Sequence, residues 1–319
     1  MAEALPLVVI ADPIDAASVE RLRAAGRCRV ADVAATPEAL VGQLADAWGL
    51  VVRSRTKVTA ELLQKAPKLA VVGRAGVGVD NVDMAAASAR GIRVFNAPTA
   101  ATASVAELTV LLLLLLARDL YPAIEGTKAG KWPKGGLGTE IEGKTIGFIG
   151  YGRIAREAAK RLAPFHPTLL AFDPFVPRVD DGTTLVPLDE LLQRSDYVSL
   201  HAALTPENRH LLNAGRLGSM KRGARIVNVA RGALIDEGAL LDALESGAVG
   251  GAALVVFEVE PPTRTALLAH PKVVATPHVG AATREGQSRA GALVVDELLR
   301  ALKGEPLTSL VSPTPGVSA

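Results

Sequence analysis

The chain has 319 residues, 49% of them hydrophobic and only 3% aromatic, with a formal net charge of +2. This length predicts two domains, each large enough to bury its own core. The near balance of 35 basic and 33 acidic residues, without a long basic run, argues against a nucleic-acid partner. Cys28 is the single cysteine, so an internal disulfide is excluded and nothing indicates a metal site.

The chain shows no membrane or export signal. Residues 1–6 lack the basic and apolar regions of a signal peptide. The apolar run from Leu108 to Ala117 covers about half a membrane span, so a buried helix is expected there. We therefore expect a cytoplasmic protein without a membrane partner.

The first hundred residues alternate strand-like and helix-like segments. Strands are predicted at 7–10, 50–52 and 69–72, and helices at 16–25 and 59–65. Short apolar runs separated by helices indicate a parallel sheet covered on both faces. A long helix at 104–118 and a polar, glycine-rich stretch at 126–143 follow. That stretch is too long for a simple connector, and we expect it to pack on another surface such as a second subunit.

The same alternation resumes at residue 144. Strands are predicted at 144–149, 169–172, 197–200, 225–229, 251–257 and 273–275, and helices at 153–162, 188–194 and 237–245. The pattern indicates a doubly wound dinucleotide-binding domain. A last helix is predicted at 286–303, followed by an extended tail at 305–319 whose end is frayed.

A glycine-rich turn, Gly-Phe-Ile-Gly-Tyr-Gly-Arg-Ile-Ala, joins the strand at 144–149 to the next helix. Gly150 permits the tight turn, and Gly152 permits a pyrophosphate to approach the backbone. The helix then begins at Arg153 and Ile154, whose amides and dipole favour phosphate. Asp173 ends the following strand, where a carboxylate accepts hydrogen bonds from an adenosine ribose. The turn therefore predicts a nucleotide cofactor, with NAD preferred over NADP.

Three polar residues follow later strands, at the edge where ligands of open α/β sheets bind. Arg231 has the planar fork that holds a carboxylate through two hydrogen bonds. His278 is a candidate acid/base, and a carboxylate beside it would fix its tautomer and favour its protonated form. Glu260 and Glu258 compete for that role. From spacing alone, a surface arginine and a structural loop histidine remain alternatives.

Several motifs in fixed order resemble the D-isomer-specific 2-hydroxyacid dehydrogenases, over nearly the whole chain. They are Gly143-Lys144-Thr145, Gly150-Tyr151-Gly152-Arg153-Ile154, Asn228-Val229-Ala230-Arg231-Gly232, Asp236-Glu237, Phe257-Glu258-Val259-Glu260-Pro261 and Pro277-His278-Val279-Gly280. Segments 73–83 and 281–287 look most like the phosphoglycerate dehydrogenase branch of that family.

The resemblance implies an α/β fold with two doubly wound parallel-sheet domains. A Rossmann-type NAD-binding domain, residues 99–285, would be inserted into a flavodoxin-like substrate-binding domain made of residues 1–98 and 286–319. It also implies a homodimer, with the helix from Ser104 and the following arm at the interface. No segment corresponding to the C-terminal regulatory module of serine-sensing members follows residue 319, so feedback control by serine is not expected.

The resemblance also assigns roles to individual residues. Arg231 would bind the substrate carboxylate, assisted by backbone amides of residues 74–78, and Glu260 would orient the proton donor, His278. The residues expected at the cofactor are Val77, Gly150, Gly152, Arg153, Ile154, Asp173, Ala202, Val229, Ala230, Arg231, Val255, His278 and Gly280. Those expected at the substrate are Arg53, Ser54, Arg74, Gly76 and Arg231.

Four positions depart from the family pattern. Val255 stands where an aspartate normally contacts the nicotinamide carboxamide, and its loss would weaken cofactor positioning. Ala203 replaces a proline, Ala101 an asparagine close to the substrate, and Ala155 the third glycine of the fingerprint. Val255 is the change that bears most on activity.

A phosphorylated substrate would need basic partners. The candidates are Arg53, Arg55, Lys57, Arg74, Lys131 and Lys134. Arg53 and Arg55 would point the same way if the chain stays extended after its strand. A solvated charged face is the alternative.

Together these features predict an NAD-dependent dehydrogenase that oxidises D-3-phosphoglycerate to 3-phosphohydroxypyruvate, the entry to serine synthesis. Hydride transfer would take place between the domains, with His278 as the acid/base. One alternative is a glyoxylate or hydroxypyruvate reductase. The other is an NAD-binding sensor or corepressor-like protein with weak catalysis, which Val255 favours.

Overall fold

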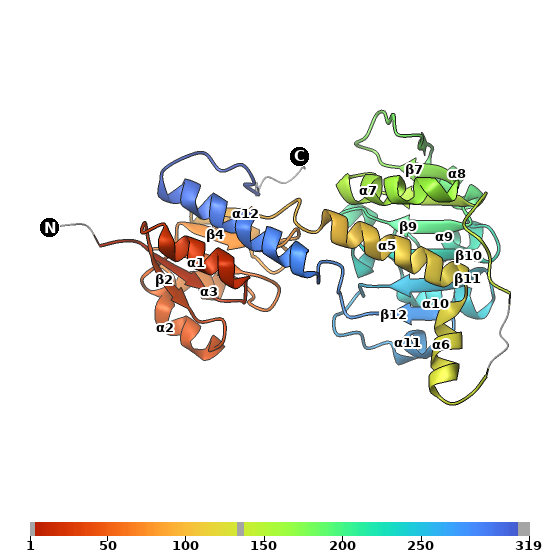
Figure 1. Ribbon diagram of the computed structural model, residues 1–319, viewed down its shortest axis with the longest axis horizontal. Coiled ribbons are helices and arrows are strands. Elements are labelled where there is room, and N and C mark those ends of the chain that lie inside the picture. The colour runs from red at the N-terminus through yellow and green to blue at the C-terminus, as the bar shows by residue number, and fades with distance from the viewer. Residues whose placement is uncertain (1–3, 133–136, 312–319) are drawn as a thin grey trace. The chain divides into compact units, whose positions relative to one another are not determined.

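The computed structural model describes residues 4–132 and 137–311, and the chain divides into two compact units (Figure 1). The first unit comprises Met1–Ala101 and Ala281–Ala319, and the second comprises Thr102–Gly280. Each is built on one parallel sheet flanked by helices. The predicted α/β class with two parallel sheets is therefore confirmed.

The first unit contains a five-stranded sheet in the order β2-β1-β3-β4-β5, which is the flavodoxin-like order. Its strands are β1 (Leu7–Ile10), β2 (Arg29–Asp32), β3 (Ala47–Val52), β4 (Val71–Arg74) and β5 (Arg93–Asn96). Its helices are α1 (Ala16–Ala24), α2 (Leu40–Leu44), α3 (Ala60–Gln64), α4 (Met84–Ala89) and α12 (Arg284–Leu302).

Both faces of this sheet are covered. Val8 and Ile10 of β1 lie in one buried cluster with residues of α1 and α12, including Leu22 and Leu298. The alternate residues of β1 lie in another, which α2, α3 and α4 complete. This period of two explains why β1 is apolar throughout: a strand buried on both faces offers no position for a polar side chain.

The second unit contains a seven-stranded sheet in the order β12-β11-β10-β9-β6-β7-β8. Its strands are β6 (Thr145–Ile149), β7 (Thr168–Phe172), β8 (Thr184–Leu185), β9 (Tyr197–Leu200), β10 (Ala224–Asn228), β11 (Val249–Leu254) and β12 (Val273–Ala275). Its helices are α5 (Thr102–Ala117), α6 (Leu120–Lys128), α7 (Arg153–Leu162), α8 (Leu188–Arg194), α9 (Ala214–Ser219), α10 (Glu237–Glu245) and α11 (Thr265–Ala269).

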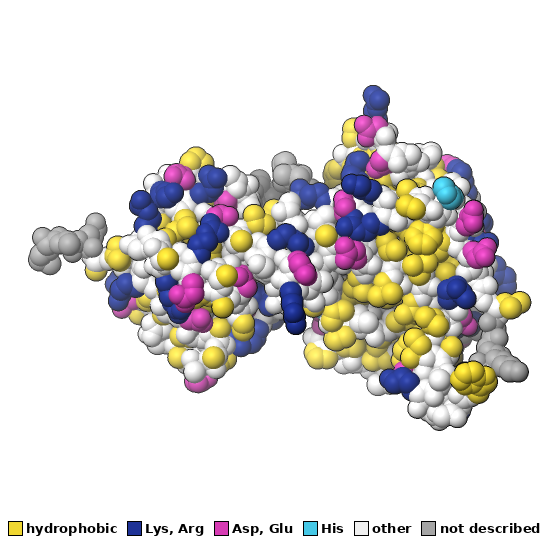
Figure 2. All heavy atoms as spheres, in the orientation of Figure 1, with side chains coloured by type: hydrophobic (Ala, Val, Ile, Leu, Met, Phe, Trp, Pro, Cys, Tyr) yellow, Lys and Arg dark blue, Asp and Glu magenta, His cyan; other side chains and the backbone are white. Residues whose placement is uncertain are grey.

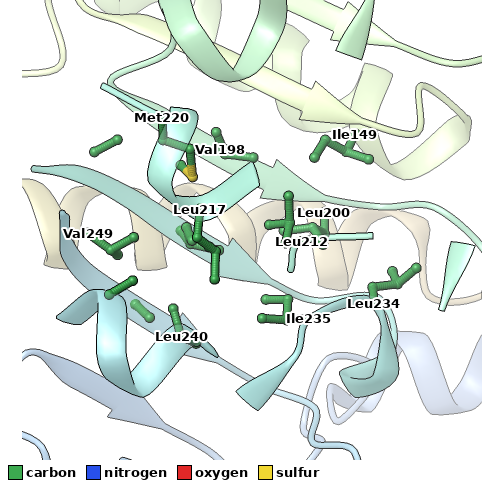
Figure 3. Packing of buried hydrophobic residues seen from close by; sticks show 14 of the residues in the cluster. Ile149, Val198, Leu200, Leu212, Leu217, Met220, Leu234, Ile235, Leu240 and Val249 are labelled. Carbon is green, nitrogen blue, oxygen red and sulfur yellow. The ribbon is translucent and has the colours of Figure 1, made fainter. Parts of the chain in front are cut away.

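The strand order reverses direction at β6. The chain builds outward from β6 to β7 and β8, and then returns to place β9 on the other side of β6. This is the Rossmann arrangement, in which ligands bind at the carboxyl ends of the two strands beside the reversal. Buried side chains from β9, α9 and α10 pack on one face of the sheet (Figure 3). Helices α5 and α7 cover the other face.

Several sequence-based boundaries were wrong. β11 ends at Leu254 rather than at residue 257, because its last pairing is with Ala275, the last residue of β12. Helix α6 reaches Lys128, inside the stretch that was expected to be irregular. β4 begins at Val71, two residues later than predicted.

The tail after α12 adds one antiparallel bridge to the first sheet, between Leu310 and Phe95. The buried carboxylate of Glu297 holds it by accepting hydrogen bonds from the Thr308 backbone N–H, at 2.9 Å, and from the Thr308 hydroxyl. The part of the predicted tail beyond residue 311 lies outside the described residues. No helix in the described parts of the chain, α5 included, is both long and apolar enough to cross a membrane.

Candidate active site

The glycine-rich turn after β6 is packed against the segment that follows β9. Gly150 has φ +85°, and a Cβ atom there would lie 2.6 Å from the backbone nitrogen of Ala202. The His201 backbone N–H also donates to the Ile149 carbonyl, at 2.7 Å. Only glycine satisfies both the backbone angle and the close approach, so the turn and Ala202 are held together at the strand reversal.

The N-terminus of α7 has no side-chain cap. Gly152 is its N-cap residue, and no atom lies within 4 Å of the position that a Cβ would occupy there. The first amides, including those of Arg153 and Ile154, therefore receive no hydrogen bond from a cap side chain, and they lie at the positive end of the helix dipole. Such an arrangement suits a pyrophosphate group.

The Asp173 carboxylate is oriented by two backbone amides. Its Oδ2 accepts a hydrogen bond from Tyr151 N–H, at 2.7 Å, and its Oδ1 from Phe175 N–H, at 2.9 Å. The carboxylate retains further lone pairs that can accept from ribose hydroxyls. The structure thus connects Asp173 directly to the fingerprint turn.

The sequence did not identify Tyr151 as part of this arrangement. Its hydroxyl donates to Asp181, at 2.9 Å, and lies 2.6 Å from the Thr183 hydroxyl, while the Arg156 guanidinium lies over its ring. Burial raises the pKa of Tyr151 to about 12, so it stays a neutral donor. The network fastens the turn to the loop after β7. No local spacing could have indicated it, because Asp181 is 30 residues away.

His278 and Glu260 form a direct pair. His278 Nδ1 lies 2.8 Å from Glu260 Oε2, and the other Glu260 oxygen accepts from the Phe257 backbone N–H, at 3.2 Å. The His278 backbone N–H donates to the Val255 carbonyl, at 2.9 Å, with φ at +41°. The imidazole and the carboxylate are 52% and 39% exposed, so both are open to a ligand.

Glu258, the competing carboxylate, has a different partner. Its Oε2 lies 2.9 Å from His210 Nε2, and its Oε1 accepts from the Glu237 backbone N–H, at 3.1 Å. Burial raises the pKa of Glu258, but the hydrogen bonds from His210 and Glu237 and the charge of Arg209 outweigh it, so the pKa lies below its usual range. Glu258 is thus committed to a neighbouring loop.

Arg231 lies in a loop that Asn228 shapes. Asn228 is 1% exposed; its Oδ1 accepts from Ala230 N–H and its Nδ2 donates to the Arg231 carbonyl, both at 3.0 Å. The Arg231 guanidinium donates to the Ala230 carbonyl, at 2.7 Å. Asn228 was quoted in a motif but given no role, and its position as the last residue of β10 was the available signal.

The Arg231 loop rests on the loop that carries Glu260. A Cβ atom on Gly232 would lie 1.8 Å from the Phe257 carbonyl carbon and 2.4 Å from the Glu258 nitrogen. The two backbones can approach this closely only because residue 232 has no side chain. The second unit therefore brings the loops of Arg231, Glu260 and His278 together.

The remaining predicted cofactor residues of the second unit lie at the same sheet edge. Val255 is 1% exposed and belongs to an apolar cluster that includes Ala253 and Val274. Its side chain offers no hydrogen bond where the family has a carboxylate. Val229 is half-buried. A Cβ atom on Gly280 would lie 3.3 Å from Val105 Cγ2.

In the first unit, the loop after β3 is held by the buried Asp12 carboxylate. Asp12 accepts from Arg53 N–H, at 2.6 Å, from the Thr56 hydroxyl, at 2.6 Å, and from Arg55 Nε, at 3.1 Å. Burial raises the pKa of Asp12, but these donors outweigh it, so the pKa lies below its usual value. The chain bends at Ser54, so it does not stay extended and the premise for aligning Arg53 with Arg55 fails.

The basic side chains of this loop therefore differ in how many of their hydrogen bonds are already made within the protein. Arg55 also donates to the Ala11 carbonyl, at 2.5 Å, and to the Ala34 carbonyl, at 2.9 Å. Among the described residues, the Arg53 guanidinium makes one long contact, 3.5 Å, with the Pro13 carbonyl. Lys57 is exposed. Arg55 thus stabilises the loop, and Arg53 and Lys57 are the better candidates for a ligand.

The loop after β4 holds the other first-unit candidates. The Arg74 side chain lies across Gly76, where a Cβ would be 1.6 Å from Arg74 Nη1. The Ala97 N–H donates to the Gly76 carbonyl, at 2.9 Å, and the Asn96 amide donates to the Val77 carbonyl. These bonds fix the backbone of the loop. Lys131, in the second unit, is exposed, and Lys134 lies outside the described residues.

Comparison with known proteins identifies the family. The model of the D-isomer specific 2-hydroxyacid dehydrogenase NAD-binding domain matches residues 110–280. The D-3-phosphoglycerate dehydrogenase of Homo sapiens is 43% identical over 309 residues, which are 96% of this chain and 58% of that protein. The hydroxypyruvate reductase of Thermotoga maritima is 42% identical over 92% of this chain and 98% of its own length. A glyoxylate reductase structure from Paecilomyes thermophila has a TM-score of 0.86 at 32% identity, covering 97% of this chain and 99% of its own.

The Rossmann sheet, the uncapped α7 and the oriented Asp173 define an NAD-binding protein, and the family domain that matches this region is an NAD-binding domain. The residues present fit the dinucleotide, since the uncapped N-terminus of α7 suits a pyrophosphate and a carboxylate acceptor directly follows β7. The chain belongs to the D-isomer-specific 2-hydroxyacid dehydrogenase family, as its motifs predicted. It spans 58% of the length of the Homo sapiens phosphoglycerate dehydrogenase that it matches.

Proposed function

We propose that the chain is an NAD-dependent dehydrogenase that oxidises D-3-phosphoglycerate to 3-phosphohydroxypyruvate, the reaction at the entry to serine synthesis. The observation that carries the proposal is the 2.8 Å pair of His278 Nδ1 and Glu260 Oε2, with the Arg231 loop packed on the loop of Glu260. Oxidation of a hydroxy acid requires a proton acceptor, a partner that holds it, and a cation for the carboxylate.

Glu260 acts on His278 by fixing its tautomer. Because Nδ1 is bonded to the carboxylate, Nε2 is the nitrogen left to take the hydroxyl proton during oxidation and to return it during reduction. The Arg231 guanidinium holds the substrate carboxylate and so orients the hydroxyl toward Nε2. NAD, when bound, supplies the two-electron acceptor.

Two regions would hold the cofactor. The amides at the start of α7 suit the pyrophosphate, and Asp173 suits the adenosine ribose. The Asp173 carboxylate also disfavours a 2′-phosphate through charge repulsion, which makes NAD the expected form. We assign the second unit to NAD and the first unit to the substrate.

The phosphorylated substrate is favoured by the cations of the first unit and by the relatives. Arg53 and Lys57 lack carboxylate partners among the described residues, and a phosphate would supply one. Relatives named D-3-phosphoglycerate dehydrogenase are 43% identical over 96% of the chain. A hydroxypyruvate reductase is 42% identical, so a non-phosphorylated 2-keto acid is the second candidate.

The test is NADH oxidation by the purified protein with 3-phosphohydroxypyruvate, hydroxypyruvate and glyoxylate side by side. The proposal predicts that kcat/KM for the phosphorylated acid exceeds the others by about tenfold or more, since one charged contact is worth about that factor. A preference for hydroxypyruvate or glyoxylate would select the reductase. No turnover with any of the three acids, while NADH still binds, would select a sensor, the candidate that the buried Val255 favours.

A homodimer is part of the proposal. Figure 2 shows hydrophobic side chains gathered on the second unit over α5 and α6. The exposed large hydrophobic residues of these two helices are Leu111, Leu120, Tyr121 and Ile124, and Trp132 is exposed shortly after α6. Exposed apolar patches of this kind mark interfaces. We expect a dimer in sedimentation velocity and a monomer for Ile124→Glu; a wild-type monomer would overturn this assignment. We also place the protein in the cytoplasm, where its one thiol, buried Cys28, stays reduced.

A further inference from the structure

A polar hollow lies in the second unit, away from the candidate active site. It has a volume of about 140 Å³ and is lined by Thr139, Lys144, Asp196, Tyr197, Lys221, Arg222, Gly223, Ala224 and Arg225. Lys144, Asp196 and Ala224 stand at the amino ends of β6, β9 and β10. Gly150, Ala202 and Val229 follow the carboxyl ends of the same parallel strands, so the hollow occupies the opposite edge of the sheet.

Three cations at this hollow lack a carboxylate partner among the described residues. Arg225 Nη1 donates to the hydroxyls of Thr139 and Tyr197, each at 3.2 Å. Arg222 makes one long contact with the Ser246 carbonyl, at 3.4 Å. The Lys144 ammonium has no bonded neighbour in the parts of the chain that the structure describes. Clustered like charges repel one another, so an anion among them would be stabilising.

The one acidic residue at the hollow is already neutralised. Asp196 Oδ1 accepts from the Lys221 ammonium, at 2.9 Å, and Oδ2 accepts from the Thr145 backbone N–H, at 2.8 Å. Asp196 therefore does not balance Lys144, Arg222 and Arg225. Those three charges are left for a ligand.

The hollow also contains a hydroxyl on a buried residue. Tyr197 is 1% exposed, and its hydroxyl lies 2.7 Å from that of Thr139, so the pair is fixed in position. The guanidinium of Arg225 keeps further N–H groups beyond the one that it shares with them. Cations and hydroxyls that line a space of several water volumes match a compact oxyanion.

We propose that this hollow binds a phosphate group, either as inorganic phosphate or as the phosphate of a small monoester. Three cations lining one hollow favour a doubly charged oxyanion over a single carboxylate. The site is separate from the NAD pyrophosphate site and does not depend on the proposed reaction. Lys144 and Arg222 supply charge, and Arg225 with Tyr197 supplies directed hydrogen bonds.

The experiment is isothermal titration calorimetry of inorganic phosphate into the NADH-saturated protein, so that the pyrophosphate site is occupied. The test variant is the double substitution Lys144→Gln with Arg222→Gln, and the control is Lys160→Gln, an exposed cation on α7. Loss of two charged contacts is expected to weaken phosphate binding by at least about tenfold, while the control leaves it unchanged. Tyr197→Phe keeps the ring and removes one hydroxyl, and it should weaken binding by a smaller factor.

A second titration with glycerol 3-phosphate distinguishes the sources. If glycerol 3-phosphate binds more tightly than inorganic phosphate, and this binding is equally lost in the double variant, the ligand is a monoester. If inorganic phosphate binds more tightly, the ligand is the free ion. Wild-type protein that shows no phosphate binding would overturn the proposal. Equal phosphate affinity in the wild type, the double variant and Tyr197→Phe would also overturn it, because phosphate would then be bound elsewhere.

Discussion

At position 232 the chain has no room for a side chain, and this single residue sets the spacing of two catalytic candidates. Gly232→Ala would place a methyl group inside the backbone of Phe257 and Glu258, and the Arg231 and Glu260 loops would have to separate. A displacement of about 1 Å costs about 100-fold in rate. We therefore expect kcat to fall by about that factor, with NADH affinity unchanged.

Steady-state kinetics and NADH fluorescence titration check this prediction. Gly218→Ala is the matched control, because nothing lies within 4 Å of its Cβ position. Unchanged kcat in folded Gly232→Ala would mean that the spacing of the two loops does not matter for turnover.

His201 links stability to pH. Burial lowers its pKa from 6.5 to about 3, so the folded protein keeps it neutral while the unfolded chain takes up a proton below pH 6.5. The folded state is therefore progressively disfavoured as pH falls from 6.5 toward 3, by about 1.4 kcal/mol per pH unit.

Urea unfolding at about pH 7 and about pH 5 measures this effect. The free energy of unfolding of the wild type should fall by about 2 kcal/mol more than that of His201→Gln, which cannot titrate. Equal losses in the two proteins would show that His201 is solvated or protonated in the folded state.

For single residues, the sequence indicated candidate site residues but not all of their hydrogen-bond partners. Arg231, Glu260 and His278 were predicted from their places after strands and from the family motifs, and the structure brings their loops together. Spacing alone could not separate Glu258 from Glu260, because the choice depends on where the His210 loop lies; only the family resemblance pointed to Glu260. Asn228 and Tyr151 were missed as organisers, because their partners are set by backbone turns and by a distant loop.

Among the elements, the β6–α7 turn and the end of β7 form one unit through Asp173. Asp173→Asn keeps an oxygen that can accept from a backbone amide but removes the charge, so it tests recognition of the ribose with less disturbance of the turn. We expect NADH affinity to fall by about tenfold and discrimination against NADPH to shrink, since a hydrogen bond to a charged group is worth about 1.5–3 kcal/mol.

Fluorescence titrations with NADH and NADPH give both quantities. Asp180→Asn, an exposed carboxylate of the same loop, is the control and should behave as the wild type. Unchanged selectivity in Asp173→Asn would remove Asp173 from the ribose site.

Strand burial decided which elements could be predicted. β1, β6 and β9 are apolar runs with nearly every residue buried, and they were predicted correctly. The edge strand β2 has no fully buried residue, and the two-residue β8 is too short to show a period. Both were missed because an edge strand need not be apolar.

For the whole molecule, the strand orders of the two sheets were predicted on different grounds. The Rossmann order of the second unit follows from the glycine-rich turn and the alternation after residue 144, whereas the flavodoxin-like order of the first rested on family resemblance. Strand order is not encoded in local apolar runs, since any buried strand can occupy any central position. The helix α6 was missed because its Pro122 and Gly126 indicate a loop.

The central claim is that His278, held by Glu260, moves the proton in an NAD-dependent oxidoreduction. Its most direct test measures NADH binding and turnover of 3-phosphohydroxypyruvate in wild type, His278→Ala and Glu260→Gln. The account predicts that both variants still bind NADH, with kcat lowered about 10²- to 10⁴-fold in His278→Ala and less in Glu260→Gln. Turnover by His278→Ala at the wild-type rate would contradict it.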